Sequence, residues 1–337
     1  MFIVRNTIQS DLEDLFDLSK QALLLNLPQD KQVIKRKIEE SISSFKSPNQ
    51  DISKNHFIFC LEDTSTNKVL GVSMIHGKHG TENKPHFYLT VGNEKRSSET
   101  LNKNYQHETL KFGFEPNGYT EIGGLVLDRN YRGHPDKLGK LLSLSRFLFI
   151  AENKKLFTKQ IHSELMPPLT SEGSSLLWEA IGRKFFQMEY WEADQLSQTN
   201  KEFILNLFPQ ETIYTKLLPE AAKASIGKVG PDTLPVKKML EKIGFKYTNE
   251  VDPFDGGPHY RANIDDISVI NDSKHIDIVI KEESIKANSI SCLTGSSCLE
   301  FTATYSQFDK SNNQCFINSS FNNKIILNKE KSRTFLL

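Results

Sequence analysis

The stretch Gly123–Phe149, GGLVLDRNYRGHPDKLGKLLSLSRFLF, restricts the fold more than any other part of the chain. Its first residues are mostly apolar, and together with the residues just before them they predict a β-strand over 120–127. Its last residues place leucine and phenylalanine at helical spacing, which predicts a helix. Pro135 and Asp136 suit the first turn of that helix, where a missing N–H and a negative charge are both tolerated. A strand followed closely by a helix indicates an α/β fold.

The turn between this strand and this helix is basic and contains glycine. Such a connection gathers unpaired backbone N–H groups and the positive end of the helix dipole, a combination that suits a pyrophosphate. The residues expected to bind it are Arg132, Gly133, Lys137, Gly139 and Lys140. The sequence contains neither the P-loop pattern nor the glycine pattern of dinucleotide-binding turns. A plain basic connection with no ligand therefore stays open as the alternative.

The N-terminal part of the chain also predicts strands and helices in alternation. FIVRNT predicts a first strand, and residues 10–25 predict a helix that begins with a capping box of Ser10 and Glu13. Two β-rich runs around the polar turn Thr64–Asn67 predict a hairpin. Residues 77–107 are polar and aperiodic, so we expect a loop with one strand near HFYLTVG.

Two later segments resemble each other in pattern. In each, an apolar helix is expected to end at a glycine, Gly182 or Gly244, with an aromatic-rich strand after it. A duplicated unit is one interpretation, and the ordinary recurrence of helix, glycine and strand in α/β proteins is the other. From Ser268 the chain becomes rich in serine, asparagine and lysine, and strands such as HIDIVI and KIILN predict a small β-rich appendage.

Composition excludes several classes of protein. Lys plus Arg and Asp plus Glu are equal at 42 each, so no global charge attracts nucleic acid or an anionic membrane. No apolar run reaches the roughly 18 residues of a spanning helix, and the first residues do not resemble a signal peptide, so a cytoplasmic location is expected. The four cysteines form no CxxC pair and have no histidine at ligand spacing, which predicts free thiols and no metal site.

The order of elements and the basic turn together resemble the GNAT acyltransferase superfamily, in which the corresponding turn binds the pyrophosphate of an acyl-coenzyme A. Longer stretches resemble arginine N-succinyltransferase more specifically, in order and with few gaps from Met1 to about Ala262. They are LLSLSRFLFIAE, GRKFFQMEYWEAD, IYTKLLPEAAKASIGKVGPDTLPVKKMLEKIGFKY and VDPFDGGP. This resemblance implies transfer of a succinyl group from succinyl-CoA to the α-amino group of L-arginine in arginine catabolism.

The same resemblance implies roles for single residues. It places the family's succinyl-CoA contact at Leu125, on the strand that ends at Leu127, and the backbone N–H groups of that strand suit a developing oxyanion. It also places the family's proton-donor histidine at Gly230, where glycine carries no proton. His259 is the nearest substitute for that acid, and a surface or loop histidine is the other interpretation.

A guanidinium group requires a carboxylate partner. The candidates are Asp255, Asp252 and Glu121, and Gly256 and Gly257 complete a substrate-binding loop with the first of them. FDGGP is also a strong turn signal, so the same residues suit a tight turn with no ligand.

The predicted architecture is α/β, with tandem GNAT-like units and a small β-rich C-terminal extension. The first expected unit, 1–195, contains the acyl-CoA turn. The second, 196–267, lies on the substrate side, and the extension covers 268–337. We expect succinyl-CoA as cosubstrate and no permanently bound cofactor. Small molecules are the only ligands expected, and either a homo-oligomer or a hetero-oligomer stays open. The alternatives are a catalytically weak or inactive CoA- or arginine-binding subunit, or an N-acyltransferase that uses another acyl-CoA or ornithine.

Overall fold

The computed structural model describes residues 1–21, 26–281, 285–294, 299–318 and 331–337, which form two compact units. Unit 1 contains Met1–Lys78, Thr120–Ile161 and Asn263–Leu337, and unit 2 contains His79–Tyr119 and His162–Ala262. The sequence predicts consecutive units with limits at 195 and 267, whereas in the structure the chain leaves unit 1 twice and returns to it twice. The difference arises because strands distant in sequence pair with one another. Both units combine helices with strands, so the α/β prediction is confirmed.

Unit 1 is built on a sheet whose first three strands form an antiparallel meander and whose C-terminal strands include one parallel pair. Its strands are β1 (Phe2–Asn6), β2 (His56–Asp63), β3 (Lys68–His79), β6 (Tyr119–Leu127), β11 (Lys274–Lys281), β12 (Ser289–Thr294), β13 (Phe301–Asp309), β14 (Gln314–Asn318) and β15 (Lys331–Leu336). β2 pairs with β1 on one side and β3 on the other, both antiparallel. The predicted hairpin around Thr64–Asn67 is therefore confirmed.

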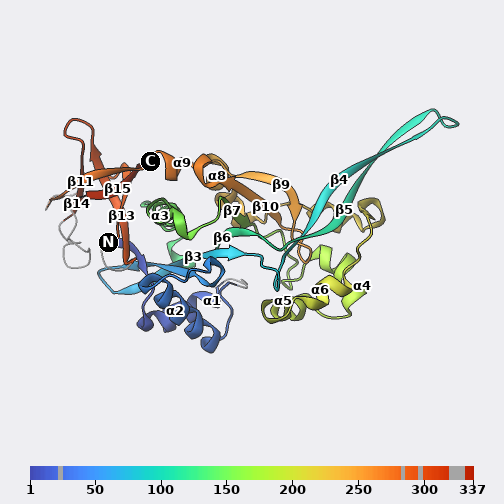
Figure 1. Ribbon diagram of the computed structural model, residues 1–337, viewed down its shortest axis with the longest axis horizontal. Coiled ribbons are helices and arrows are strands. Elements are labelled where there is room, and N and C mark those ends of the chain that lie inside the picture. The colour runs from blue at the N-terminus through green and yellow to red at the C-terminus, as the bar shows by residue number, and fades with distance from the viewer. Residues whose placement is uncertain (22–25, 282–284, 295–298, 319–330) are drawn as a thin grey trace. The chain divides into compact units, whose positions relative to one another are not determined.

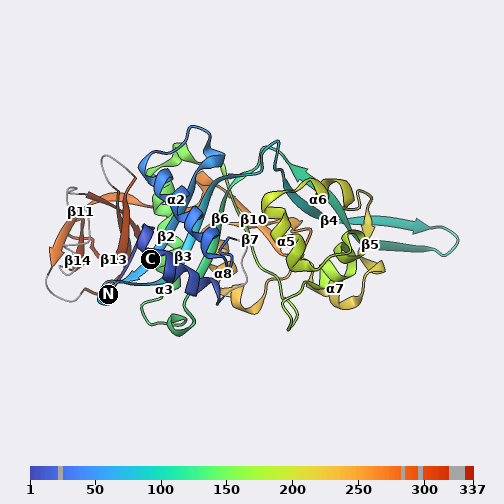
Figure 2. The same cartoon turned by 90° about the horizontal axis from the view of Figure 1, so that it is seen from below.

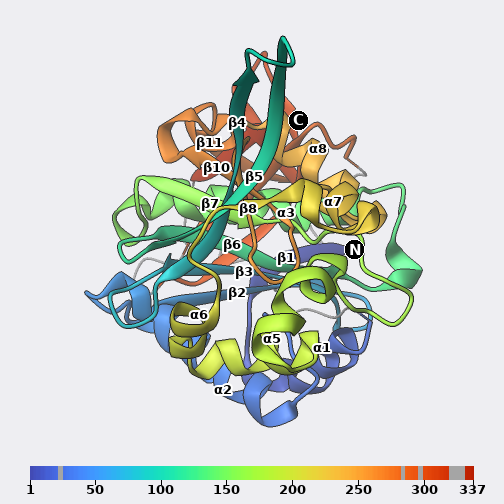
Figure 3. The same cartoon turned by 90° about the vertical axis from the view of Figure 1, so that its right-hand side faces the viewer.

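Helices cover both faces of this meander (Figures 1 and 3). They are α1 (Leu12–Ser19), α2 (Lys31–Lys46), α3 (Leu138–Glu152) and the short α9 (Ser268–Asn271). Alternate residues of β2 face opposite layers, as expected of a strand buried on both sides. Ile58 and Cys60 share a core with α1 and α2, whereas the ring of Phe59 lies 5.2 Å from that of Phe149 in α3.

The first helix differs from its prediction. α1 begins after Asp11, whose carboxylate accepts the Ile8 N–H at 2.8 Å and pairs with the Arg5 guanidinium at 2.8 Å. The predicted capping box of Ser10 and Glu13 is wrong because this ion pair fixes the start of the helix at Asp11. The helix ends at Ser19, and the predicted residues 22–25 lie outside the described part of the chain.

The C-terminal strands form a small closed barrel. Neighbours follow the order β12, β15, β11, β14 and β13, and β12 also pairs with β13, which closes the ring. β13 pairs with β1 as well, antiparallel, with Val4 opposite Ala303. The predicted β-rich character of this segment is confirmed, and HIDIVI lies in β11. The predicted strand KIILN lies outside the described residues.

Unit 2 contains a run of antiparallel strands with helices packed against it. Its strands are β4 (His86–Ser98), β5 (Lys103–Glu115), β7 (Gln160–Glu164), β8 (Ile213–Tyr214), β9 (Lys246–Val251) and β10 (Pro258–Asn263). Its helices are α4 (Arg183–Phe186), α5 (Tyr190–Thr199), α6 (Glu202–Leu207), α7 (Glu220–Ser225) and α8 (Leu234–Lys242). Among the residues described, no helix of the chain is long and apolar enough to cross a membrane.

β4 and β5 form a long hairpin that extends beyond the helices of unit 2 (Figure 2). They pair antiparallel from His86 opposite Glu115 to Ser98 opposite Lys103. The strand predicted near HFYLTVG is confirmed, and residues 80–85 and 99–102 connect strands as the predicted loop requires. The loop predicted for 77–79, 93–98 and 103–107 is wrong, because these residues belong to β3, β4 and β5. The outer half of the hairpin is largely exposed to solvent on both sides, so its sequence carries no apolar alternation that would reveal the strands.

The two predicted helix-ending glycines differ in the structure. Gly244 has φ of +114° after α8 and precedes β9, as predicted. Gly182 instead lies in a π-helical turn, Trp178–Gly182, that continues into α4. A Cβ at Gly182 would lie 2.2 Å from the Trp178 ring, so this glycine permits close packing rather than ending a helix. The strand predicted after Gly182 is wrong. The first of the two similar segments therefore does not have the order helix, glycine and strand that a duplicated unit requires.

Candidate acyl-CoA and substrate sites

The predicted cofactor turn connects β6 to α3 in unit 1. Asp128 follows β6 and accepts the Asn130 N–H at 2.9 Å, and a 3-10 turn over Arg129–Tyr131 comes next. Gly133 has φ of +75°, and α3 begins at Leu138, after Lys137 in the left-handed region. The first helical turn predicted at Pro135 and Asp136 is therefore wrong, because the left-handed Lys137 delays the helix.

The basic residues of this turn face solvent. Arg132, Gly133 and Lys137 are exposed, and Gly139 and Lys140 are half-buried. Arg132 donates from Nε to the Leu127 carbonyl at 3.5 Å. A Cβ at Gly133 would meet nothing within 4 Å, and one at Gly139 would meet only the Leu127 side chain, at 3.8 Å. The turn therefore has the room in front of it that an anion requires.

The start of α3 is fixed by the Lys137 carbonyl. This oxygen accepts the N–H groups of Lys140 at 2.8 Å and Leu141 at 3.2 Å, and also the hydroxyl of Tyr305 at 3.0 Å. Tyr305 belongs to β13, so a C-terminal strand holds the beginning of the proposed phosphate-binding helix in place.

β6 is irregular next to the residue predicted to contact the acyl group. Gly124 has φ of +56°, and a Cβ there would lie 2.9 Å from the Met74 sulfur. Arg146 of α3, only 2% exposed, donates to the carbonyl of Gly123 at 3.2 Å and to that of Met74 at 3.4 Å. Burial lowers the pKa of Arg146 to about 9, so it is still charged at neutral pH. The positive φ and the buried cation together determine the backbone direction at Leu125 and, two residues later, Leu127.

Glu121 also belongs to β6 and to unit 1. It is buried, and its carboxylate accepts a hydrogen bond from Asn26 Nδ2 at 3.4 Å. The other predicted substrate residues, Asp255, Gly256 and Gly257, belong to unit 2.

The FDGGP segment is a hydrogen-bonded loop between β9 and β10. Asp252 accepts the N–H groups of Phe254 at 2.7 Å and Asp255 at 2.9 Å, and Asp255 accepts that of Gly257 at 2.7 Å. Gly256 has φ of +77°, which favours glycine. The predicted tight turn is confirmed, while the predicted role in substrate binding stays a prediction.

Two other segments pack closely against this loop. Gly227 donates its N–H to the Gly256 carbonyl at 2.9 Å, and Gly230 donates to the Met166 carbonyl at 2.9 Å. A Cβ at Gly257 would lie 2.5 Å from the Leu165 carbonyl, and one at Gly230 would lie 2.8 Å from the Pro167 carbonyl. Gly230, the predicted position of the family's histidine, therefore lies directly against neighbouring backbone.

Carboxylates around this loop repel one another. Burial, with the nearby charge of Glu164, raises the pKa of Asp252 to about 6. Burial and the charge of Asp252 raise the pKa of Asp255 well above its usual value, and the same two causes raise that of Asp194. A bound cation would relieve this repulsion, so the loop is electrostatically suited to a positively charged ligand.

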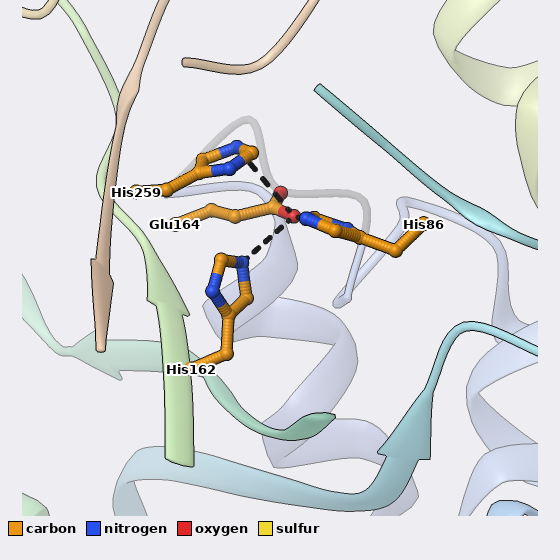
Figure 4. Close-up of side chains that lie close together, drawn as sticks. All are labelled: His86, His162, Glu164 and His259. Carbon is orange, nitrogen blue, oxygen red and sulfur yellow. Dashed lines mark hydrogen bonds and ion pairs between the residues drawn. The ribbon is translucent and has the colours of Figure 1, made fainter. Parts of the chain in front are cut away.

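His259, the predicted substitute acid, lies in β10 and is completely buried, so the interpretation as a surface or loop histidine is wrong. It forms a cluster with His86, His162 and Glu164, and Figure 4 shows the three rings turned toward the carboxylate. The sequence did not predict this cluster, because its members come from β4, β7 and β10. The one local signal was the i, i+2 spacing of His162 and Glu164, which places both on one face of a strand.

Comparison with known proteins identifies the relatives of the chain. The profile of the arginine N-succinyltransferase beta subunit family matches residues 2–269. The arginine N-succinyltransferase of Yersinia pestis (strain Pestoides F) is 37% identical over 289 residues, which cover 85% of this chain and 81% of the relative. That of Citrobacter koseri is 34% identical over 83% of this chain and 81% of the relative.

A solved structure shares the fold. The arginine/ornithine succinyltransferase subunit AI from Pseudomonas aeruginosa superposes with a TM-score of 0.85, over 100% of this chain and 98% of that chain, at 23% identity. The profile match extends from β1 through the basic turn and the FDGGP loop to α9. The chain belongs to the arginine N-succinyltransferase family.

Proposed function

We propose that this protein transfers a succinyl group from succinyl-CoA to the α-amino group of L-arginine. The observation that carries the proposal is the single family match over residues 2–269, which includes both the basic turn of unit 1 and the FDGGP loop of unit 2. The ligands are small molecules, and succinyl-CoA is a cosubstrate rather than a permanently bound cofactor.

The acyl-CoA site is proposed at the turn before α3. Arg132, Lys137 and Lys140 supply positive charge, and Gly133 and Gly139 leave the backbone open to a pyrophosphate. The irregular strand at Gly124 supports a role for the backbone of Leu125 and Leu127, because a left-handed residue interrupts regular ladder pairing and leaves N–H groups for another acceptor. In this proposal those N–H groups stabilise the oxyanion that forms on the thioester carbonyl.

The amino-acid site is proposed at the carboxylates of unit 2. Asp252 and Asp255 lie on the FDGGP loop, and the charge of Asp194 also acts on Asp255. A guanidinium group would satisfy two carboxylates at once through its planar set of donors. Glu121 of unit 1 stays a further candidate for contact with arginine.

The proposed reaction is direct attack in a ternary complex. The neutral α-amine attacks the thioester carbon, a C–N bond forms, and the C–S bond breaks with its electron pair left on the CoA sulfur. The amine loses its extra protons to solvent or a base. A thiol has a pKa of about 8.5, so the thiolate leaves at neutral pH without much help from an acid. The glycine at Gly230 is therefore compatible with turnover, and His259 as a substitute acid stays a prediction.

A thiol-release assay with the purified chain tests this proposal. We expect saturable release of CoA thiol that requires both succinyl-CoA and L-arginine, with N2-succinyl-L-arginine identified by mass. Parallel reactions with acetyl-CoA or L-ornithine measure the preference for each substrate. Binding of succinyl-CoA or arginine without release would instead support a non-catalytic subunit, the second candidate that the glycine at Gly230 favours.

A further inference from the structure

We propose that His86, His162, Glu164 and His259 form a binding site for one divalent transition-metal ion of the zinc class. All four residues belong to unit 2, and each offers one ligand atom within 4.8 Å of the others. The proposal goes beyond the succinyl transfer proposed above. It meets that proposal at His259, because an imidazole whose Nε2 binds a metal cannot donate a proton from that atom, so bound metal would exclude His259 as the substitute acid.

The ligand atoms have the spacing of a tetrahedral site. Zinc binds imidazole nitrogen and carboxylate oxygen at about 2.0–2.2 Å, which places neighbouring ligand atoms of a tetrahedron about 3.4 Å apart. From Glu164 Oε1 the distances are 3.4 Å to His162 Nε2, 3.5 Å to His86 Nδ1 and 3.9 Å to His259 Nε2. These three distances lie within about 0.5 Å of the tetrahedral value, with the largest difference at His259, and all ligand atoms lie within 4.8 Å of one another.

Hydrogen bonding within the cluster does not by itself account for the arrangement. The three imidazoles are completely or almost completely buried, and their nitrogens converge on one carboxylate oxygen. Three imidazoles with one carboxylate are the ligands that zinc and its neighbours in the periodic table prefer.

The surroundings support the site in two ways. His259 Nδ1 faces Glu250 Oε2 at 3.8 Å, the carboxylate–histidine arrangement that orients metal ligands. The Glu164 side chain is 32% exposed, so an ion can reach the cluster from solvent.

Arg261 opposes metal binding. Its Nε donates to His162 Nδ1 at 3.3 Å, whereas His162 must carry a proton on Nδ1 when Nε2 binds a metal. Arg261 has other partners, since it pairs with Glu250 and lies 4.1 Å from the Tyr119 ring centre. Metal binding thus requires Arg261 to give up one contact, and the substitution Arg261→Gln should tighten it.

Titration of the full chain with zinc chloride, followed by calorimetry and metal analysis after dialysis, tests the proposal. We expect Glu164→Gln and His162→Asn each to lose one equivalent of tightly bound zinc, with affinity reduced at least about 100-fold, more than the loss of a supporting residue causes. His107→Gln is the matched control, because His107 lies on the β4–β5 hairpin outside the cluster, and it should bind zinc like the unmodified protein. Equal zinc binding by Glu164→Gln, His162→Asn and this control would overturn the proposal.

A measurement on the unmodified protein keeps the test independent of whether the variants fold. The Co²⁺ form should show the intense visible absorption of a four-coordinate ion, and X-ray absorption of the Zn²⁺ form should show several imidazoles around the metal. A six-coordinate spectrum, or a shell without imidazole, would also overturn the assignment. Tighter binding by Arg261→Gln would support the geometry specifically, since a nonspecific surface site would not respond to that residue.

Discussion

The buried guanidinium of Arg146 donates to the Gly123 carbonyl at 3.2 Å, one residue before the left-handed Gly124. The substitution Arg146→Met would leave this carbonyl and that of Met74 buried without their donor, which costs about 1–3 kcal/mol for each unsatisfied group. We expect a lower melting temperature together with a higher KM for succinyl-CoA, because the strand at Leu125 loses its support. Arg146→Lys keeps the charge but has fewer donors. Its melting temperature and its KM for succinyl-CoA should therefore lie between those of the unmodified protein and those of Arg146→Met. An unchanged KM in folded Arg146→Met would contradict the proposed role of this strand.

Gly139 and Gly133 separate ligand binding from stability. Gly139 lies in a helix with room for a Cβ, so Gly139→Ala should raise the free energy of unfolding by up to about 1 kcal/mol through helix propensity. The same methyl group should raise the KM for succinyl-CoA if the pyrophosphate approaches this backbone. Gly133→Ala, at φ of +75°, should instead destabilise the protein by about 1–2 kcal/mol through backbone strain. If Gly139→Ala leaves the KM unchanged, the phosphate does not lie against this turn of helix.

Gly230 requires two variants, because any side chain there meets the Pro167 carbonyl. Gly230→Ala and Gly230→His should both lose about 1–3 kcal/mol of stability from overpacking. The ratio of their kcat values then isolates the imidazole. We expect a gain of less than about 10-fold, since a thiolate with a pKa of about 8.5 needs little protonation to leave. A gain of about 100-fold or more would show that the chain lacks an acid that its reaction needs.

Asp252 makes stability depend on pH. Its pKa rises from 3.8 to about 6 on folding, so between these values the folded protein holds a proton that the unfolded chain has released. The free energy of unfolding should therefore fall as pH rises from 3.8 to about 6, and it should stay constant at higher pH. The fall is at most about 3 kcal/mol, because each unit of pKa difference corresponds to about 1.36 kcal/mol.

Asp252→Asn keeps the acceptor for the Phe254 and Asp255 N–H groups and removes the charge. This variant should unfold at a higher temperature at pH 7, yet raise the KM for L-arginine by about 10- to 100-fold through loss of a charge-assisted hydrogen bond. Asp51→Asn is the matched control, because Asp51 accepts the Ser53 N–H at 3.1 Å in a similar turn at an exposed site. A normal KM in Asp252→Asn would place the guanidinium elsewhere.

The sequence predicted what local pattern encodes. The strand at 120–127, the hairpin around Thr64–Asn67 and the left-handed Gly244 were all visible because apolar alternation or turn chemistry marks them. The outer half of the hairpin of β4 and β5 carries no such pattern, because it is polar on both faces. Gly182 was misread because the Trp178 ring, rather than backbone geometry, requires glycine there.

Whether a candidate site could be predicted depends on how far apart its residues lie in the sequence. The basic turn is one uninterrupted stretch of sequence, and so is the FDGGP loop. Both could therefore be predicted as candidate sites from the sequence. The histidine cluster joins three strands, from His86 to His259, so no spacing rule could assemble it. The packing of Gly230 against the backbone of Pro167 was hidden for the same reason.

Pairing of β1 with β13 also determines when unit 1 can be completed during synthesis. The first strand leaves the ribosome early, but its partner at 301–309 is synthesised only when almost the whole chain has been made. Until then one edge of the nascent sheet is open, which is the condition under which strands pair wrongly or aggregate. A fragment cut at residue 269 would contain everything that the family profile matches and would keep that edge open permanently.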